Sequence, residues 1–332
     1  MFCRNHRSMN YIEKIKEPIL DEMQEFEQVY KKALNTNNHL LNNVYDYIME
    51  GSGKLLRPIL TILSAKLLGE VNQQTLFGAF SLELLHTASL VHDDVVDDTN
   101  ERRSRDSVNA RWTNKIAVLT GDYILSQALY FANETKNISI IREISLLGMG
   151  MADGELLQLE NTKPSMISEK EYFEIIRKKT ALLFDTCAKV GGISVGATDD
   201  DLHHLKIYGE TLGICFQIKD DIFDYYEDAQ IGKPTGNDVR DGKITLPLIY
   251  ALKNSNEKDR AEIVKLIEDK NFTDENINKI MQFARDFGGL EYAGLMMNEY
   301  KQKALNELSG FPEGEVKKAL QNYMDFVTER DF

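Results

Sequence analysis

The chain has 332 residues, of which 42% are hydrophobic and six are proline, so a large core of long helices is possible. Its net charge of −14 argues against a nucleic-acid backbone as a partner. Cys3, Cys187 and Cys215 show neither disulfide nor metal-site spacing, which favours a reducing, cytoplasmic location. No apolar run approaches the roughly 20 residues of a transmembrane helix, and the N-terminus lacks a signal-peptide core.

Apolar side chains at helical spacing predict helices through most of the chain. The predicted segments are residues 10–32, 38–49, 55–68, 72–92, 113–133, 138–160, 168–190 and 199–226, followed by four or five helices between 244 and 330. Residues 98–112 are polar and arginine-rich, which predicts a loop. We therefore expect an all-α fold with one domain over residues 10–332. A disordered extension is expected at residues 1–9, and Met1 and Met9 are both candidate starts.

Two short stretches concentrate negative charge, VHDDVVDD at residues 91–98 and DDIFD at 220–224. Each has carboxylates at positions i, i+1 and i+4: Asp93, Asp94 and Asp97 in the first, and Asp220, Asp221 and Asp224 in the second. On a helix the first and last of these share a face and repel each other. A cation is therefore expected between the clusters. Mg²⁺ fits best, because it is a hard ion that bridges carboxylates to phosphates.

Other interpretations of these clusters are weaker. One such cluster alone is equally typical of a solvated helix end, but two clusters flanked by apolar residues disfavour that interpretation. No EF-hand loop supports calcium, and the absence of clustered cysteine and histidine disfavours zinc.

Basic residues near both clusters predict binding of anions. Each is typical of a surface charge when taken singly, but arginine and lysine are also the residues that bind phosphate. Together with the carboxylates they indicate two phosphate groups, one held through metal and one by cations alone. The residues are Lys54, Arg57, Arg102, Arg103, Lys179, Lys233 and Lys243.

Eight motifs follow one another along the chain: GSGKLLRP, LLHTASLVHDDVVDD, ERRS, GDYIL, KTALL, FQIKDDIFDY, GKPTGND and GKITLPL. Over about residues 54–247 they resemble the trans-isoprenyl diphosphate synthases, the polyprenyl synthetase family. The resemblance implies a helical bundle around a deep cavity (the type I isoprenoid synthase fold), usually homodimeric. It also implies head-to-tail condensation of isopentenyl diphosphate onto an allylic diphosphate. Ser104 departs from the pattern, since the family commonly has glycine there.

The resemblance implies a role for each matching residue. Mg²⁺, three ions per active site, would be bound mainly by Asp93, Asp97 and Asp220, with Asp94, Asp221 and Asp224 in support. Isopentenyl diphosphate would be held without metal by Lys54, Arg57, His86 and Arg103. The allylic diphosphate would contact Arg102, Lys179, Thr180, Gln217, Lys233 and Lys243. The expected catalytic set is Asp93, Asp97, Asp220, Lys179 and Lys243.

Two side chains near the clusters have more than one possible role. His86 alone is typical of a satisfied core histidine, and Lys219, which precedes the second cluster, could reach the surface or pair with a carboxylate. The expected mechanism is electrostatic stabilisation of the departing diphosphate, with the released diphosphate as the base and water excluded.

Small residues before the first cluster predict a long product. In this family a bulky residue there blocks the growing tail, whereas this chain has Thr87, Ala88 and Ser89, of which Ala88 and Ser89 are the expected chain-length residues. We expect a hepta- to decaprenyl product, delivered to a membrane and suited to a quinone side chain. A floor to the cavity could come from Leu125, Leu129 or Phe131, although ordinary core packing explains these residues as well.

Three other functions compete with a long-chain synthase. A short-chain farnesyl or geranylgeranyl diphosphate synthase is the main alternative. A class I terpene cyclase normally has one Asp-rich motif and no second cluster of this kind. A non-catalytic subunit of a heteromeric synthase would be expected to have lost a cluster, and both are intact here.

Overall fold

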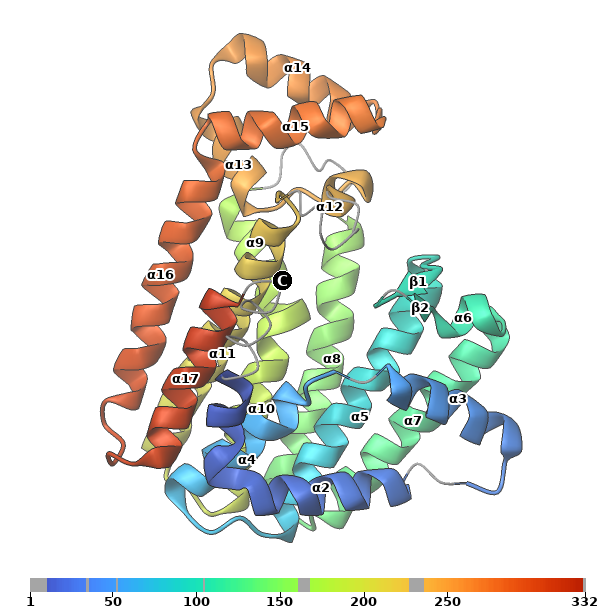
Figure 1. The fold of residues 1–332 in the computed structure, drawn as a ribbon, viewed down its shortest axis with the longest axis vertical. Coiled ribbons are helices and arrows are strands. Elements are labelled where there is room, and N and C mark those ends of the chain that lie inside the picture. Colours follow the sequence, from blue (N-terminus) through green and yellow to red (C-terminus); the bar gives the residue numbers. More distant parts are fainter. Residues whose placement is uncertain are drawn as a thin grey trace. The chain divides into compact units, whose positions relative to one another are not determined.

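The computed structural model describes residues 11–33, 36–51, 53–103, 105–160, 168–226 and 236–330. Over these ranges the regular secondary structure is helical apart from one two-stranded antiparallel ladder, which confirms the predicted all-α fold (Figure 1). The predicted disordered extension at residues 1–9, and the residues Ser104 and Lys233, lie outside the described residues. No helix in the described ranges is both long and apolar enough to span a lipid bilayer.

The described residues form the following helices and strands, given in chain order. They are η1 (Glu17–Ile19), α2 (Leu20–Ala33), α3 (His39–Glu50), α4 (Leu56–Leu68), α5 (Gln73–Val96), β1 (Glu101–Arg102), β2 (Arg105–Asp106), α6 (Val108–Arg111), α7 (Asn114–Glu134), α8 (Ile138–Glu160), α9 (Glu169–Ile176), η3 (Arg177–Ala181), α10 (Leu182–Ser194), α11 (Asp199–Phe223), α12 (Asn237–Arg240), α13 (Leu246–Asn254), α14 (Glu257–Glu268), α15 (Asp274–Asp286), α16 (Gly289–Leu308) and α17 (Glu315–Glu329).

Two segments differ from the sequence-based prediction. The stretch 98–112, expected to be a loop, contains β1, β2 and the short helix α6. The helix expected to end at Gly191 and Gly192 continues to Ser194 as α10. Both differences have tertiary causes: the arginine-rich stretch folds back on itself, and Gly191 is needed for close helix packing rather than for a turn.

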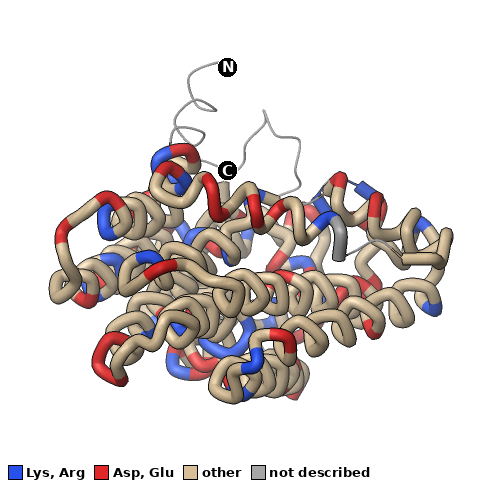
Figure 2. Tube along the Cα trace, turned by 90° about the horizontal axis from the view of Figure 1, so that it is seen from below, with Lys and Arg blue, Asp and Glu red and all other residues tan. Residues whose placement is uncertain are grey.

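The chain divides into two compact units. Unit 1 comprises Met1–Gly148, Phe184–Lys206 and Leu308–Tyr323, and unit 2 comprises Met149–Leu183, Ile207–Glu307 and Met324–Phe332. Acidic and basic residues are interspersed along the described helices, so the negative charge is spread over the chain (Figure 2). The expectation of a single domain over residues 10–332 stays a prediction.

In unit 1, α5 packs against both α4 and α7 (Figure 1). Asn72 begins α5 with a capping box, in which its side chain accepts from the backbone N–H groups of Gln74 and Thr75. Farther along the helix, Phe80 stacks on Phe26 with ring centroids 4.4 Å apart. Burial of α5 on two sides explains why its sequence is apolar nearly all round.

In unit 2, the apolar part of α11 is buried in the core. Tyr208, Leu212 and Ile218 of α11 are fully buried. α13 packs against α9 and α15, and Tyr250 of α13 stacks on Tyr292 of α16 with centroids 4.1 Å apart. The second carboxylate cluster thus follows directly from a buried helix, as the first one does in unit 1.

Gly191 allows α10 to approach α4 closely. A Cβ atom built on Gly191 would lie 2.2 Å from the backbone oxygen of Thr61 and 2.8 Å from Cβ of Ser64. Because the nearest obstacle is backbone, side-chain rotation cannot relieve the clash. The helix pair would have to separate.

We therefore expect Gly191→Ala to lower the free energy of unfolding by about 3 kcal/mol, the upper range for overpacking a core. Urea denaturation measures this change. Gly294→Ala is the matched control, because Gly294 lies within α16 and a Cβ atom added there would meet no atom within 4 Å. That substitution should stabilise the protein by up to about 1 kcal/mol through helix propensity. Equal effects at the two positions would contradict the packing explanation.

Candidate functional site

The first carboxylate cluster occupies the last turn of α5. Asp94 is buried, Asp93 is half-buried, and Asp97 is exposed at the C-cap, where its N–H donates to Asp93 O over 2.8 Å. Asp93 and Asp97 are one turn apart, as the spacing predicted, while Asp94 is turned toward the protein. The outer two carboxylates therefore keep exposed surface, whereas the middle one is enclosed by the protein.

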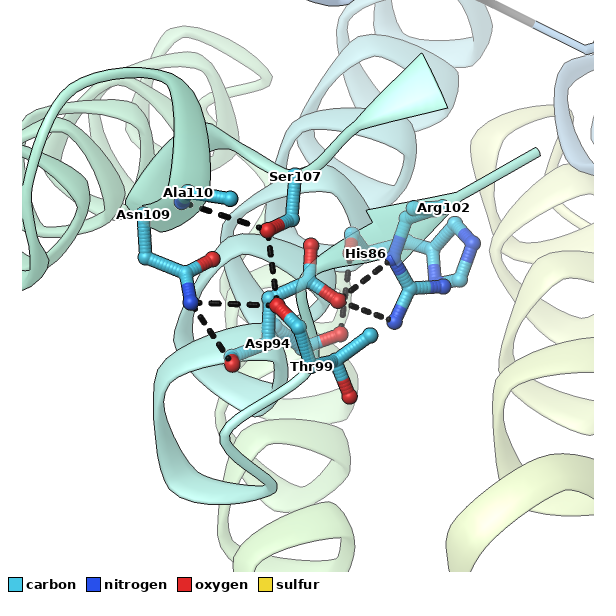
Figure 3. Close-up of polar contacts among 8 residues, drawn as sticks. His86, Asp94, Thr99, Arg102, Ser107, Asn109 and Ala110 are labelled. Carbon is cyan, nitrogen blue, oxygen red and sulfur yellow. Dashed lines mark hydrogen bonds and ion pairs between the residues drawn. The ribbon is translucent and has the colours of Figure 1, made fainter. Parts of the chain in front are cut away.

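Asp94 holds the segment that follows α5 (Figure 3). Its Oδ1 accepts from Nε and Nη2 of Arg102, each at 2.8 Å, and its backbone oxygen accepts from Nδ2 of Asn109 at 3.2 Å. Burial raises the pKa of the Asp94 carboxyl, and the charge of Arg102 opposes that shift. Arg102, expected to contact the allylic diphosphate, is thus engaged with Asp94 in this structure.

The rest of this segment is fixed by backbone oxygen atoms. Ser107 Oγ donates to Thr99 O over 2.7 Å, and Asn109 Nδ2 reaches the same oxygen at 3.1 Å (Figure 3). Ser107 also caps α6, because its Oγ accepts from the N–H of Ala110. These contacts make the arginine-rich stretch an ordered support for Arg102 and Arg103.

Arg57 and Arg103 form a cationic group near His86 in unit 1. Burial lowers the pKa of His86, and the nearby charges of Arg57 and Arg103 lower it further, so the imidazole is neutral at pH 7. Burial also lowers the pKa of Arg103, with the charges of Arg102 and Arg57 adding to the effect. Lys54 is exposed. The structure therefore brings together three of the four residues expected to bind isopentenyl diphosphate.

The loop before α4 positions Arg103. Its Nη1 donates to the backbone oxygen of Gly51 over 2.7 Å, and its backbone adopts a left-handed conformation with φ of 54°. A Cβ atom at Gly53 would lie 3.2 Å from the Arg103 guanidinium. The glycines of the GSG motif thus leave room for this arginine as well as forming a turn.

Glu83 is a charged neighbour of this group that sequence reasoning missed. Burial raises the pKa of its carboxyl, and Arg57 and Arg103 oppose the shift. Its Oε2 is shielded from solvent and has no hydrogen-bond partner among the described residues. A single glutamate within the apolar run before His86 was the available signal.

In unit 2, Asp221 is buried at the centre of a hydrogen-bonded chain. Its Oδ2 accepts from the Tyr172 hydroxyl at 2.5 Å and its Oδ1 from Gln217 Nε2 at 2.8 Å. Thr180 Oγ1 lies 2.7 Å from Gln217 Oε1 and donates to it. The expected residues Thr180 and Gln217 therefore lie with Asp221, while Tyr172 was not anticipated.

Asp224 is hydrogen-bonded to the start of α12. Its two carboxylate oxygens accept from the backbone N–H groups of Asn237 and Asp238, each at 3.0 Å. The half-buried Asp238 is a further carboxylate that sequence reasoning missed. Burial raises its pKa, and so does the charge of Asp224. The motif GKPTGND contained this residue, but its position within an expected loop gave no sign that it would be near Asp224.

The remaining cluster residue, Asp220, forms an ion pair with Arg330 at the end of the described chain. Lys219, whose role the sequence left open, places its Nζ 4.8 Å from the centroid of the Phe223 ring. The lysine therefore packs on an aromatic face, a favourable position for a cation.

The predicted lysines of unit 2 are paired with carboxylates. Lys179 lies in the π-helical turn η3, a local distortion often found at functional sites. Its Nζ lies 2.6 Å from Glu155 Oε2, and Lys243 Nζ lies 3.0 Å from Asp241 Oδ2. Both side chains are about one-third exposed, so an anionic substrate could reach them.

Residues 38–284 of the chain match the model of the polyprenyl synthetase family. The chain belongs to the polyprenyl synthetase family. It is 33% identical to the octaprenyl diphosphate synthase of Haemophilus influenzae, over 98% of both chains. The family is one of prenyl-transferring enzymes, and this chain is a prenyl diphosphate synthase by membership.

Solved structures of polyprenyl synthetases share the fold. A geranylgeranyl pyrophosphate synthase from Bacteroides thetaiotaomicron is 42% identical, with a TM-score of 0.85 over 97% of this chain and 100% of its own. A decaprenyl diphosphate synthase from Rhodobacter capsulatus is 33% identical, with a TM-score of 0.91 over 96% and 99%. A polyprenyl synthase from Caulobacter crescentus, complexed with calcium and isoprenyl diphosphate, is 29% identical, with a TM-score of 0.90 over 96% and 98%.

The donor atoms of both clusters suit a magnesium ion of the kind expected for this family. Within the described ranges, no group of three or more His, Cys, Asp and Glu side chains is arranged to hold a metal by itself. Mg²⁺ does not need such a cage, because it keeps several waters and binds one or two carboxylates plus substrate phosphates. Asp93 with Asp97 in unit 1, and Asp220 in unit 2, offer oxygen ligands of this kind.

The Tyr172–Asp221 hydrogen bond gives a testable stability effect. Tyr172→Phe leaves a buried carboxylate oxygen without its donor, so the free energy of unfolding should fall by about 2 kcal/mol. Chemical denaturation measures this change. In an Asp221→Leu background the same substitution should cost far less, because the acceptor is already absent. An undiminished cost in that background would show that the hydroxyl stabilises something else.

Proposed function

We propose that this polyprenyl synthetase is a Mg²⁺-dependent prenyltransferase that condenses isopentenyl diphosphate head-to-tail onto an allylic diphosphate. The proposal rests on the burial and hydrogen bonding of the aspartates in the two carboxylate clusters. In each, the middle Asp is buried and hydrogen-bonded, at Asp94 and Asp221, while Asp93, Asp97 and Asp220 keep exposed surface. The exposed carboxylates of both clusters support ligand binding, and so support an enzyme over a non-catalytic subunit.

The cationic group of unit 1 supports a metal-free site for isopentenyl diphosphate. Arg57 and Arg103 supply positive charge, and the exposed Lys54 adds a movable one. His86 is neutral, so it contributes a hydrogen bond rather than charge. A diphosphate here needs no metal because the guanidinium groups already offset its charge.

The residues of unit 2 support binding of the allylic diphosphate. In the metal-bound enzyme, Mg²⁺ ions would be held by Asp93 and Asp97 at the first cluster and by Asp220 at the second, and they would neutralise charge on the departing diphosphate. Lys179 and Lys243 can turn from their carboxylate partners to phosphate oxygens, since both side chains are partly exposed. Gln217, fixed by Asp221 and Thr180, presents a positioned amide. The chain offers no dedicated base, so the released diphosphate takes the final proton.

A decisive assay uses purified protein, Mg²⁺, farnesyl diphosphate and labelled isopentenyl diphosphate. We expect elongated products, and a loss of turnover of at least about 100-fold in Asp93→Ala and in Asp220→Ala. Circular dichroism of both variants should match the parent protein, which separates lost chemistry from lost fold. No elongation by the parent protein would reject the enzyme, and unchanged turnover in both variants would reject the metal ligands.

We further propose a long product, in the hepta- to decaprenyl range. The octaprenyl and decaprenyl synthases among the similar proteins support this length, whereas the geranylgeranyl synthase at 42% identity supports the shorter alternative. Ala88 is buried in α5 and adds no bulk below the first cluster. On the same face, Ser81 faces α7, where its Oγ donates to Ala128 O over 2.7 Å. The buried Leu84 and Leu85 lie between these two residues on the same side of α5, so the proposal rests on the small side chain at Ala88 itself.

A candidate floor lies farther along this face. Phe77 is eleven residues before Ala88, about 17 Å along the helix axis, and returns to the same side. It packs against Phe131 of α7 with ring centroids 5.8 Å apart, and Phe131 also contacts Phe80. Of the predicted floor residues, Phe131 therefore fits an aromatic barrier, while Leu129 is more than half exposed.

Product length tests this arrangement. Ala88→Phe should shorten the products to geranylgeranyl length or below, because the ring blocks the face that carries the tail. Ser89→Ala, which adds no bulk, should leave the products unchanged. Chromatographic sizing of the radiolabelled products measures both effects. Long products from Ala88→Phe would place the tail elsewhere, and geranylgeranyl diphosphate as the parent protein's end product would favour the short-chain alternative.

We also propose that the enzyme is a homodimer. Leu119, Tyr123 and Tyr130 of α7 are between 42% and 59% exposed, and their spacing of four and seven residues puts them on one face. An exposed apolar stripe of this kind is typical of a helix that packs against a partner. A second copy of this chain is the proposed occupant.

The proposed product fits a pathway that ends in a membrane, and a quinone side chain is the use we propose for it. A cytoplasmic location also stays a prediction. The buried free thiols Cys187 and Cys215 suit a reducing compartment.

A further inference from the structure

An ion pair joins the end of the chain's last helix to the second carboxylate cluster. Arg330 directly follows α17 and belongs to the same unit as Asp220, and its Nη2 contacts Asp220 Oδ1. The arginine side chain is 15% exposed, whereas that of Asp220 is 42% exposed. The sequence motifs did not include Arg330, and the proposed reaction gives it no role.

Arg330 is also held by parts of α11 other than the carboxylate. Its guanidinium lies 4.1 Å from the centroid of the Phe216 ring and 5.5 Å from that of Phe223. Nη2 also donates to the backbone oxygen of Phe216 over 3.3 Å. Planar guanidinium groups stack well on aromatic faces. The arginine is therefore placed beside Asp220 by contacts that do not depend on Asp220.

The surroundings of Asp220 favour a nearby cation. Its charge acts on both Asp221 and Asp238, and Asp238 is in turn close to Asp224. Negative charge on neighbouring carboxyl groups is unfavourable, and a positive charge beside Asp220 offsets that cost. A metal ion bound at Asp220 would supply the same compensation and would bring two positive charges close to the guanidinium.

We propose that Arg330 is the resident counter-ion of Asp220 in the metal-free enzyme and that Mg²⁺ has to displace it. This inference rests on the proposed function, since it takes Asp220 as a metal ligand. Arg330 then acts as a positioning residue: it keeps Asp220 compensated before metal arrives and sets the metal concentration at which the cluster fills. Metal binding frees the end of α17 from the carboxylate.

Melting temperatures measured in chelator and in rising concentrations of MgCl₂ test this exchange. Arg330→Gln should lower the melting temperature in chelator by roughly 3 °C, because Asp220 loses its counter-ion. Mg²⁺ should restore stability at a concentration about fivefold lower than in the parent protein, as expected for two coupled binding events. The melting temperature and the Mg²⁺ requirement of Arg330→Lys should lie between those of the parent protein and those of Arg330→Gln. Lysine keeps the positive charge but lacks the planar guanidinium group.

Arg285→Gln provides the matched control. Arg285 Nη2 donates to the backbone oxygen of Tyr225, so it is a second arginine bonded to the end region of α11 without an ion pair to the cluster. Its loss should lower the melting temperature equally with and without Mg²⁺. The same pattern in Arg330→Gln would overturn the proposal, because Arg330 would then have a structural role only. A higher Mg²⁺ requirement in Arg330→Gln would also overturn it, because the arginine would assist metal binding.

Asp220→Asn separates this inference from the proposed function. If the proposed metal ligands are right, this variant loses most of the Mg²⁺-induced stabilisation, and adding Arg330→Gln changes the Mg²⁺ response no further. If Asp220→Asn keeps the full Mg²⁺ response, Asp220 is not a metal ligand and both proposals fail. If Asp220→Asn loses the response while Arg330→Gln leaves the Mg²⁺ requirement unchanged, only the exchange at Arg330 is rejected.

Discussion

The compensation of clustered negative charge is the constraint on which the rest of this structure depends. Each unit ends a largely buried helix with three carboxylates, and such a group is stable only if protein donors or cations offset the repulsion. Arg102 offsets Asp94, Tyr172 and Gln217 bind Asp221, and backbone N–H groups bind Asp224. These partners also hold the segments around the clusters in place. The contacts that offset the negative charge are therefore the contacts that order those segments.

The same constraint gives the carboxylates within each cluster different roles. The middle carboxylate is buried in both, because a residue at i+1 points about 100° away from the face shared by i and i+4. It becomes a structural anchor, while Asp93, Asp97 and Asp220 keep solvent-exposed surface. Several residues expected to meet substrate are therefore engaged with protein groups first. Arg102, Lys179 and Lys243 all have carboxylate partners in the structure.

The fold class and the positions of the clusters could be predicted because they depend on local periodicity. The apolar spacing that buries α5 and α11 also fixes where their last turns lie, and the i, i+4 pairs follow from helix geometry. The segment around Arg102 and Arg103 could not be predicted, because its order comes from contacts such as Ser107 with Thr99 and Arg103 with Gly51. Glu83, Asp238 and Arg330 escaped prediction for the same reason, since each gains its importance from residues distant in the chain.

The sequence alone determined the all-α architecture, the family and the two sets of candidate metal ligands, since each depends on the spacing of residues that are close together in the chain. Only the tertiary structure decided which protein groups bind the buried carboxylate of each set. It also decided that His86 is neutral among arginines, and that Arg330 lies against Asp220. Burial and distant charges set these properties, and neither quantity exists until the helices are packed.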